Sequence, residues 1–229
     1  MYLGRIVQGT SGVNARPGRR VGLARSGVSP KHRPVLMSEF DVQIPGHPLH
    51  VIQRGHCRAA CFTCDPDRVA YLHWLGVYAA NLGCALHAYV LMGNHVHLLV
   101  TPSRPEGVSG LMRALGERYT RYVREAHERG GPLLEERFKG LTLRSRQHLL
   151  GCMRYIELNP VRAGLVAAPG EYRWSSFRSN ALGHEDALVT PHSCYYALGR
   201  SPALRQAAYR ALFRDEASGT GPRRTGAHA

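Results

Sequence analysis

Two histidines in an apolar stretch are the first residues of this chain that could do chemistry. His95 and His97 alternate with apolar residues in a run that ends at Val100, and a Gly-Asn pair separates this run from an earlier apolar one. Gly-Asn between two apolar runs is typical of a hairpin turn between buried strands. Alternate side chains of a strand face the same side, so both imidazoles would project together. They could then share one metal ion or one phosphate.

The His-x-His spacing is a weak motif by itself. With 13 His in 229 residues, chance would supply roughly 0.7 such pairs. The alternative to a ligand site is an ordinary structural pair, in which each ring finds a hydrogen-bond partner inside the core. Both interpretations stay open on these two residues alone.

A second set of candidates lies on a helix that the sequence predicts from Ser145 to Leu158. Ser145 can cap its first turn, and Pro160 predicts that the helix ends at Asn159. One side of this helix carries polar and aromatic groups, namely His148, Tyr155, Asn159 and Arg162. The tyrosine could be a half-buried aromatic residue at a helix end, or a phenolic nucleophile beside a polar metal ligand.

A third cluster, His56-Cys57-x3-Cys61-x2-Cys64, has the spacing of a metal site. Cys-x3-Cys-x2-Cys is associated with iron–sulfur binding, and together with His56 it could instead hold zinc. The chain lacks the repeated strand–helix pattern of the barrels that carry such iron–sulfur clusters, so zinc is the better of the two interpretations. Without a metal, the six Cys would be mostly reduced thiols rather than a disulfide framework.

The charge of the chain indicates a polyanionic partner. Its net charge is +14, and all of its 30 basic residues except Lys31 and Lys139 are Arg. Arg binds phosphate through two hydrogen bonds and stacks on bases, which favours nucleic acid over an acidic membrane surface. No apolar stretch has the length of a membrane span, and the N-terminus lacks the apolar segment of a secretory signal. These features predict a cytoplasmic protein without membrane contact.

Composition divides the chain into four segments. Residues 1–36 hold seven Arg or Lys and no Asp or Glu, which predicts a disordered basic arm. This arm could also be an upstream extension before Met37, or a transit peptide. Residues 47–183 form the predicted main domain, 184–216 a C-terminal helical extension, and 217–229 a disordered tail.

The order of the elements in the main domain indicates its fold. Hydrophobic periodicity predicts a strand, a helix, two strands, a helix, a strand and a helix. Their residues are 48–55, 65–83, 84–91, 95–100, 109–130, 137–143 and 145–158. This is the order of an α+β ferredoxin-like fold, an antiparallel sheet with helices on one face.

Five segments together resemble the REP-associated tyrosine transposases of bacteria, within the HUH class of single-strand DNA transposases. The resemblance covers residues 47–183. It rests on Gln53-Arg-Gly55, Tyr89-Val-Leu-Met-x-Asn-His-Val-His-Leu-Leu-Val100, Arg137-Phe138, Tyr155-Ile-Glu-Leu-Asn-Pro-Val-Arg-Ala-Gly-Leu-Val166 and Trp174-Ser-Ser176. Each segment alone is a modest signal, but the set is specific. Two departures, Gly93 for the family's usual Pro and Leu134 for a common Trp, concern a turn and local packing only.

The resemblance implies a metal-dependent transposase and nickase. It implies that His95, His97 and Asn159 hold a divalent metal, Mg²⁺ or Mn²⁺. Tyr155 would be the nucleophile that cleaves and rejoins hairpin-bearing single-stranded DNA, through a 5′-phosphotyrosine intermediate. Insertion-sequence relatives act as dimers with shared sites, whereas the REP-associated type can carry Tyr and His in one chain. This favours a monomer, with a dimer as the alternative.

Basic side chains are predicted to hold the DNA, because an Arg-rich helix face can follow a strand backbone. The predicted contacts are Arg54, Arg113, Arg118, Arg121, Arg124, Arg137 and Arg162. A function from another class is the alternative. A non-catalytic nucleic-acid-binding protein derived from a transposase would keep the fold and the basic surface.

Overall fold

The computed structural model of the chain describes residues 44–128 and 130–214. The predicted arm of residues 1–36 and the predicted tail of residues 217–229 lie outside the described residues. Within the described ranges, no helix is both long and apolar enough to pass through a membrane.

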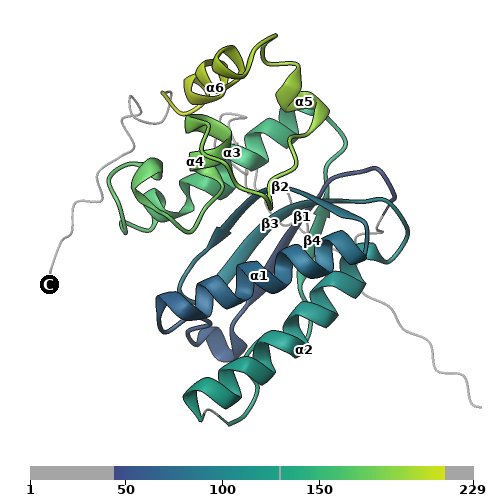
Figure 1. The fold of residues 1–229 in the computed structure, drawn as a ribbon, viewed down its shortest axis with the longest axis vertical. Coiled ribbons are helices and arrows are strands. Elements are labelled where there is room, and N and C mark those ends of the chain that lie inside the picture. Colours follow the sequence, from purple (N-terminus) through teal and green to yellow (C-terminus); the bar gives the residue numbers. More distant parts are fainter. Residues whose placement is uncertain (1–43, 129, 215–229) are drawn as a thin grey trace, which may run out of the picture. The chain divides into compact units, whose positions relative to one another are not determined.

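The described residues form a four-stranded antiparallel sheet (Figure 1). Its strands are β1 (Leu49–Arg54), β2 (Cys84–Leu91), β3 (His95–Pro102) and β4 (Lys139–Thr142), and they lie in the order β2-β3-β1-β4. This is the ferredoxin-like order, so the α+β prediction is confirmed. The two central strands, β1 and β3, carry the histidines of the candidate site.

Helices α1 (Asp65–Asn81) and α2 (Gly107–His127) cover one face of this sheet, in front of the strands in Figure 1. Strand alternation sends Val51 and Leu98 to this face, where both are fully buried and share a core with Leu75 of α1. The driving force for this packing is the removal of apolar surface from water. This face of the sheet therefore holds an apolar core.

The N-cap of helix α1 is Cys64, one residue before the predicted cap at Asp65. The Asp67 carboxylate accepts a hydrogen bond from the backbone N–H of Cys64, whose own side chain makes no cap hydrogen bond. The helix stops before Gly83, whose φ of +64° lies in the left-handed region that favours glycine. Residues local to the helix therefore fix both ends of α1, through a carboxylate at its start and a glycine after its end.

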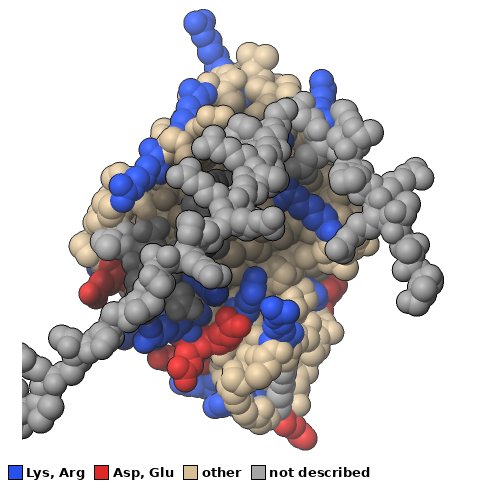
Figure 2. Space-filling model, turned by 180° about the vertical axis from the view of Figure 1, so that it is seen from behind, with Lys and Arg blue, Asp and Glu red and all other residues tan. Residues whose placement is uncertain are grey.

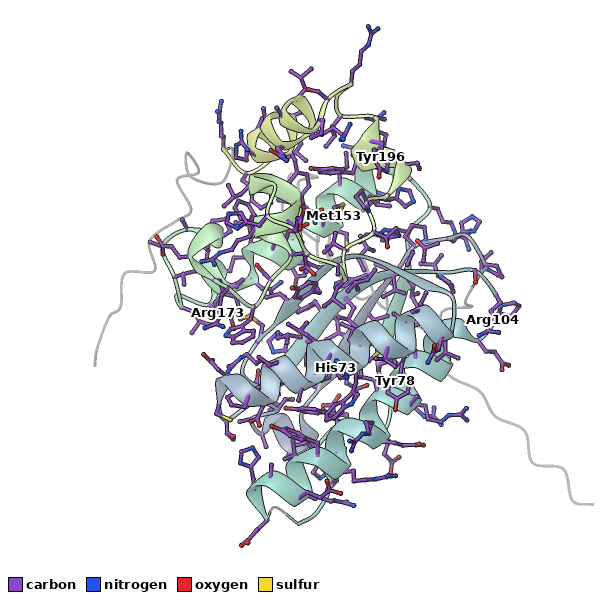
Figure 3. All side chains as sticks on the ribbon, viewed as in Figure 1. His73, Tyr78, Arg104, Met153, Arg173 and Tyr196 are labelled. Carbon is purple, nitrogen blue, oxygen red and sulfur yellow. The ribbon has the colours of Figure 1, made fainter. Side chains whose placement is uncertain are left out.

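Helix α3 (Arg146–Arg162) lies on the opposite face of the sheet, together with α4 (Phe177–Leu182), α5 (Ser193–Tyr196) and α6 (Pro202–Ala211). Met153 of α3, labelled in Figure 3, is fully buried in this second core. The helices that the fold prediction placed on one face are thus α1 and α2. Helices α3 to α6 form a second layer on the opposite face of the sheet.

A buried carboxylate joins α3 to the C-terminal helices. Glu157 accepts hydrogen bonds from Ser176 Oγ at 2.6 Å, Asn180 Nδ2 at 2.9 Å and Tyr209 OH at 2.8 Å. Burial raises the pKa of Glu157 to about 7, although the three hydrogen bonds act to lower it. One side chain therefore links α3 to α4 and α6.

Helix α3 continues through Pro160 to Arg162, so the prediction that it ends at Asn159 is wrong. Proline lacks the N–H that would donate to the carbonyl of Ile156. The side-chain amide of Asn159 supplies a donor instead, with Nδ2 at 3.4 Å from that oxygen and at 2.9 Å from the carbonyl oxygen of Tyr155. A side-chain hydrogen bond thus lets the helix pass its proline.

The segment after α3 also covers the outer edge of β2. Isolated bridges pair Val90 with Ser175 and Leu86 with Val189. Backbone groups on this edge of the sheet therefore have partners from later in the chain. At the other edge lies β4, which has only four residues.

Candidate active site

The pairing of β1 with β3 determines which side chains share the histidine face. The register places Arg54 opposite His95 and Ile52 opposite His97. Opposed residues of an antiparallel pair project to the same face, so Arg54 and both histidines lie together. His50, two residues before Ile52, projects to this face as well. This is the sheet face that α3 covers.

His50 and His97 form a buried pair of imidazoles. Nε2 of His50 lies 2.9 Å from Nδ1 of His97, and the ring centroids are 5.1 Å apart. Burial lowers the pKa of His50 to about 4. Burial, followed by the neighbouring His50, His95 and Arg54, lowers the pKa of His97 to about 2. Both rings are therefore neutral at neutral pH, and one nitrogen of the pair donates to the other.

His95 lies near the turn that precedes β3 and is half-buried. Its Nδ1 is 2.7 Å from the side-chain amide oxygen of Asn94. An amide oxygen can only accept, so Nδ1 carries the hydrogen and Nε2 presents its lone pair. Burial, and next the charge of Arg54, lowers the pKa of His95. Its ring centroid is 5.0 Å from that of His97, so two neutral imidazoles are neighbours.

Tyr155 reaches the same histidines from α3. Its ring centroid lies 5.7 Å from that of His97 and 5.9 Å from that of His50. The residue is 41% exposed, so the ring is accessible from solvent. The guanidinium carbon of Arg162 lies 5.0 Å from the ring centre. The structure thus brings the tyrosine and the histidine strand together within one chain.

Asn159 follows Tyr155 by one helical turn, but its contacts run to its own helix. Its Nδ2 donates to the carbonyl oxygens of Tyr155 and Ile156. A ligand role would therefore use the amide oxygen Oδ1. The role of Asn159 as a third metal ligand stays a prediction.

A pocket of about 290 Å³ opens beside His95. Arg54, Arg58, Asn94 and His95 line it. Two guanidinium groups and an imidazole around a small cavity suit an anion such as a phosphate group. The structure thus places the predicted DNA contact Arg54 beside the histidines, and it adds Arg58, which sequence reasoning did not single out.

The predicted DNA contacts on α2 fall into two groups. Three of them line a groove of about 700 Å³ beside the segment 132–138, namely Arg113, Arg121 and Arg124. Arg118 lies elsewhere, over the ring of Trp74 on α1, with its guanidinium carbon 4.4 Å from the ring centre. Arg137 is exposed just before β4. The predicted arginines therefore do not form one continuous surface.

The basic surface also contains acidic groups. Glu117, Glu135 and Glu136 line the same groove as the three arginines of α2. Figure 2, which views the molecule from behind, likewise shows Lys and Arg side chains mixed with Asp and Glu over the lower part of that face. The local charge around the histidines is therefore more informative than the net charge of the chain.

His50 is the residue of this site that sequence reasoning missed. The prediction placed it in the first strand without a role. Alternation along that strand puts His50 on one face with Ile52 and Arg54, and the ferredoxin-like order makes the first and third predicted strands neighbours. The register that sets His50 beside His97 comes from tertiary pairing and is not readable from local sequence.

The predicted cysteine cluster does not form among the described residues. Cys57 is exposed and Cys61 is buried, whereas Cys64 is the N-cap of α1. In the part of the chain that the structure describes, only Cys64 belongs to a group of three potential ligands, and its companions are Asp67 and His127. The helix start directs this cysteine toward α1 and α2 instead of toward the other cysteines.

Comparisons with known proteins show the family and the fold of the chain. A family model described as IS200-like transposase matches residues 44–159. No curated protein matches the chain. A solved structure of a REP-associated tyrosine transposase bound to a REP hairpin is 20% identical, with a TM-score of 0.53, over 69% of this chain and 96% of that chain. At this identity the likeness shows the fold alone.

A second solved structure, a candidate transposase from Deinococcus radiodurans R1, is 26% identical over 48% of this chain and 88% of that chain, with a TM-score of 0.36. The family match has the wider bearing, because it spans half of the chain and contains the whole sheet. It also contains His95, His97 and Tyr155. The chain therefore belongs to the IS200-like transposase family.

Proposed function

We propose that this transposase cleaves and rejoins hairpin-bearing single-stranded DNA, with Tyr155 as the nucleophile and a divalent metal at His95 and His97. The observation that carries the proposal is the contact between Tyr155 and His97, whose rings lie 5.7 Å apart in one chain. Hairpin DNA as the substrate class is supported by the REP-associated relative, which is described as bound to a REP hairpin.

The histidines fit a divalent metal because of how their other nitrogens are bonded. Nδ1 of His95 is hydrogen-bonded to Asn94, and Nδ1 of His97 to His50. Metal-bound histidines usually hold their second nitrogen in such a bond, which fixes the tautomer and the ring orientation. Nε2 of each ring would bind the metal, with Asn159 Oδ1 as the proposed third ligand.

The donor set also bears on the identity of the metal. Imidazole nitrogens suit Mn²⁺ better than Mg²⁺, and an amide oxygen suits both, so the site would accept either ion. When bound, the metal would polarise an oxygen of the scissile phosphate and stabilise the charge that develops there.

Arginines around the histidines would hold and orient the substrate. Arg54 and Arg58 line the pocket beside His95 and would bind the phosphate by charge-assisted hydrogen bonds. Arg162, stacked on the ring of Tyr155, would restrict that ring and present a cation to the incoming backbone. Together they would bring the phosphate to the nucleophile in a defined orientation.

The proposed step exchanges one phosphodiester for another. Attack of the Tyr155 hydroxyl oxygen on phosphorus would break the bond to the 3′ oxygen of the preceding nucleotide. The phenol loses its proton, the leaving 3′ oxygen gains one, and the phosphate stays on the tyrosine as a 5′-phosphotyrosine. A 3′-OH of another strand can reverse this step without ATP, because the phosphodiester is exchanged and not hydrolysed.

The proposed site needs one chain only. Tyr155, His97 and His50 meet within a single chain, so we propose that the transposase acts as a monomer. Size-exclusion chromatography with light scattering would test this, and a dimer that forms on DNA would contradict it. Because its proposed substrate is DNA, we expect it to work in the bacterial cytoplasm at the nucleoid.

A covalent-adduct assay tests the proposed function. A labelled single-stranded hairpin oligonucleotide is incubated with the protein and Mn²⁺ and then run on a denaturing gel. Wild-type protein should give a protein–DNA band, whereas Tyr155→Phe and His95→Ala/His97→Ala should give none. Tyr196→Phe is the matched control, because Tyr196 is also an exposed tyrosine but lies in α5. If wild type and Tyr155→Phe give the same band, the assignment of Tyr155 as the nucleophile is wrong. If wild type gives no band on any hairpin, the result favours the alternative of a non-catalytic DNA-binding descendant.

A further inference from the structure

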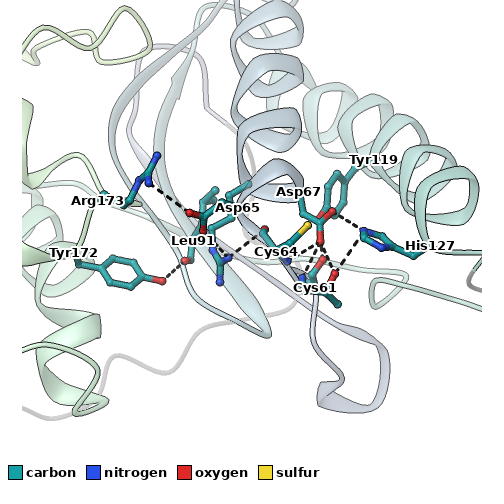
Figure 4. A network of polar contacts seen from close by, with 11 residues as sticks. Cys61, Cys64, Asp65, Asp67, Leu91, Tyr119, His127, Tyr172 and Arg173 are labelled. Atoms are coloured by element: carbon teal, nitrogen blue, oxygen red, sulfur yellow. Dashed lines mark hydrogen bonds and ion pairs between the residues drawn. The ribbon is translucent and has the colours of Figure 1, made fainter.

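A second cluster of ligand-type side chains joins the start of α1 to the end of α2 (Figure 4). Cys64 is the N-cap of α1, Asp67 lies in its first turn, and His127 is the last residue of α2. One ligand atom of each lies within 4.8 Å of the others. The cluster belongs to the α1 and α2 side of the sheet, whereas Tyr155 belongs to the α3 side.

Asp67 is the buried centre of this cluster. Its side chain is 1% exposed. Oδ2 accepts hydrogen bonds from the backbone N–H of Thr63 at 2.8 Å, from Thr63 Oγ1 at 2.8 Å and from the backbone N–H of Cys64 at 3.2 Å. Oδ1 faces Nε2 of His127 at 2.7 Å, and the His127 side chain is 30% exposed. One carboxylate oxygen is thus saturated by the helix start, and the other is directed at the histidine.

Helix capping accounts for Asp67 but not for the thiol of Cys64. At an N-cap, Ser, Thr, Asp and Asn are strongly preferred because their oxygen accepts well from backbone N–H. Sulfur is a weak acceptor, so a thiol is a poor cap, whereas its thiolate is a strong ligand for zinc. An ion pair between Asp67 and His127 alone would also not explain why the N-cap, residue 64, is a cysteine.

We propose that Cys64, Asp67 and His127 bind one zinc ion through Sγ, Oδ1 and Nε2, with water as the fourth ligand. Tetrahedral zinc has bonds of about 2.3 Å to sulfur and about 2.0–2.2 Å to nitrogen and oxygen, so neighbouring N and O ligands lie about 3.3 Å apart. Nε2 of His127, now 2.7 Å from Asp67 Oδ1, needs to move by less than about 1 Å to reach that spacing.

Zinc binding releases protons and leaves the cluster electrically neutral. Binding releases the thiol proton of Cys64, and the proton on His127 where that ring is charged. The thiolate and the carboxylate then neutralise the dication. Mg²⁺ would compete poorly here, since it prefers an octahedral set of oxygen ligands.

Zinc at this cluster would brace the connector between β1 and α1. The backbone N–H groups of Cys61 and Phe62 donate to the carbonyl of Gly93 at 2.8 Å and 3.2 Å. The hydroxyl of Tyr119 donates to the carbonyl of Cys61 at 2.7 Å. The connector thus holds the turn that leads into His95, and zinc would fix the end of the connector to α2.

Zinc binding is tested in the His95→Ala/His97→Ala background, so that the proposed catalytic metal does not contribute. Metal-free protein is titrated with zinc against a chromophoric chelator, and Co²⁺ serves as the spectroscopic probe. One zinc per chain and a thiolate-to-cobalt charge-transfer band are expected. Adding Cys64→Ser, which keeps a good helix cap, should abolish the band and weaken zinc binding by more than about 100-fold.

Two further variants keep the test decisive. Cys57→Ser is the matched control, because Cys57 is an exposed cysteine of the same connector, and both band and affinity should be unchanged. His127→Gln, at the surface, should weaken zinc binding even if Cys64→Ser fails to fold.

Three results would overturn the zinc site: no zinc bound in this background, equal affinity with and without the Cys64 thiol, or loss of the band in Cys57→Ser. None of these readouts uses DNA cleavage. The zinc site therefore stands or falls separately from the proposed function.

Discussion

The two faces of the sheet are built from adjacent residues of the same strands, yet they carry opposite chemistry. Toward α1 and α2, the central strands present Val51 and Leu98, both fully buried in an apolar core. Toward α3, the same strands present His50 and His97, which are hydrogen-bonded to each other. Because side chains alternate along a strand, a single step along the chain separates core from candidate site.

This difference separates the sources of stability from the sources of chemistry. The first face stabilises the fold mainly through burial, at about 25 cal/mol per Å² of apolar surface. The second face buries imidazoles, which costs free energy unless each is hydrogen-bonded. The rest of this face is covered by α3 and the C-terminal helices, which Glu157 links by hydrogen bonds. Substitutions of adjacent residues should therefore have different consequences according to the face on which they lie.

The largest effect is expected from His97→Ala on the second face. DNA cleavage in Mn²⁺ should fall below detection, because the variant lacks a metal ligand and leaves His50 without its partner. The free energy of unfolding should fall by only about 1–2 kcal/mol. Cleavage is measured with the labelled hairpin and stability by urea denaturation. Cleavage that persists in this variant would remove the histidine face from the mechanism.

Leu98→Ala, one residue away on the first face, should do the reverse. Deleting a fully buried leucine side chain leaves a cavity, so the free energy of unfolding should fall by about 2–5 kcal/mol. The folded variant should still bind Mn²⁺ with wild-type affinity, as measured by titration at a temperature where it is folded. Lost Mn²⁺ binding in folded Leu98→Ala would show that the two faces are not independent.

His87 is a buried histidine outside the candidate site, and it should make the free energy of unfolding depend on pH. His87 is 3% exposed, and its two ring nitrogens lie 2.6 Å from Thr190 O and 2.7 Å from Thr101 Oγ1. Burial lowers the pKa of His87 from 6.5 to about 4, the hydrogen bond to Thr190 acts to raise it, and His192 lowers it further. Both ring nitrogens are committed, so we expect His87 to serve the structure only.

As pH falls between these two pKa values, the unfolded chain binds a proton at His87 that the folded chain does not. Stability is therefore lost as the pH falls from about 6.5 to about 4, by up to about 3 kcal/mol from this group. The free energy of unfolding is measured across this range for wild type and for His87→Gln, which keeps a donor and an acceptor. Identical slopes in the two proteins would contradict the assignment.

The smallest effect is expected from His50→Leu. His50 would act on the metal only through His97, by fixing the tautomer and the orientation of that ring. Loss of such a partner typically weakens metal binding by about 10–100-fold. Mn²⁺ titration of the variant measures this, and His50→Gln should recover part of the loss. Unchanged Mn²⁺ affinity in His50→Leu would mean that the imidazole pair contributes to packing alone.

Features that depend on nearby residues could be predicted from the sequence. Periodicity indicated each strand of the sheet and its main helices, and their order indicated the ferredoxin-like fold. The cap of α3 was also predictable, since Ser145 Oγ accepts from the backbone N–H of His148 at 3.2 Å. In each case the determining contacts lie within one element or follow from the order of the elements.

Features that depend on distant contacts could not be predicted in this way. Local rules end a helix before Pro160, and they do not foresee that an Asn159 amide supplies the missing donor. The spacing of the cysteines favoured a cluster among themselves, whereas the helix start pairs Cys64 with Asp67 and with His127, far along the chain. His50 acquires a role only once the β1–β3 register is known.

The bridges that pair β2 with Ser175 and Val189 close one edge of the sheet. Left open, this eight-residue strand would offer its backbone groups to any second molecule. A chain cut after Arg162 would keep every side chain proposed for cleavage, yet it should aggregate through that uncovered strand. The smallest usable form of this transposase is therefore set by its resistance to aggregation, and not by its chemistry.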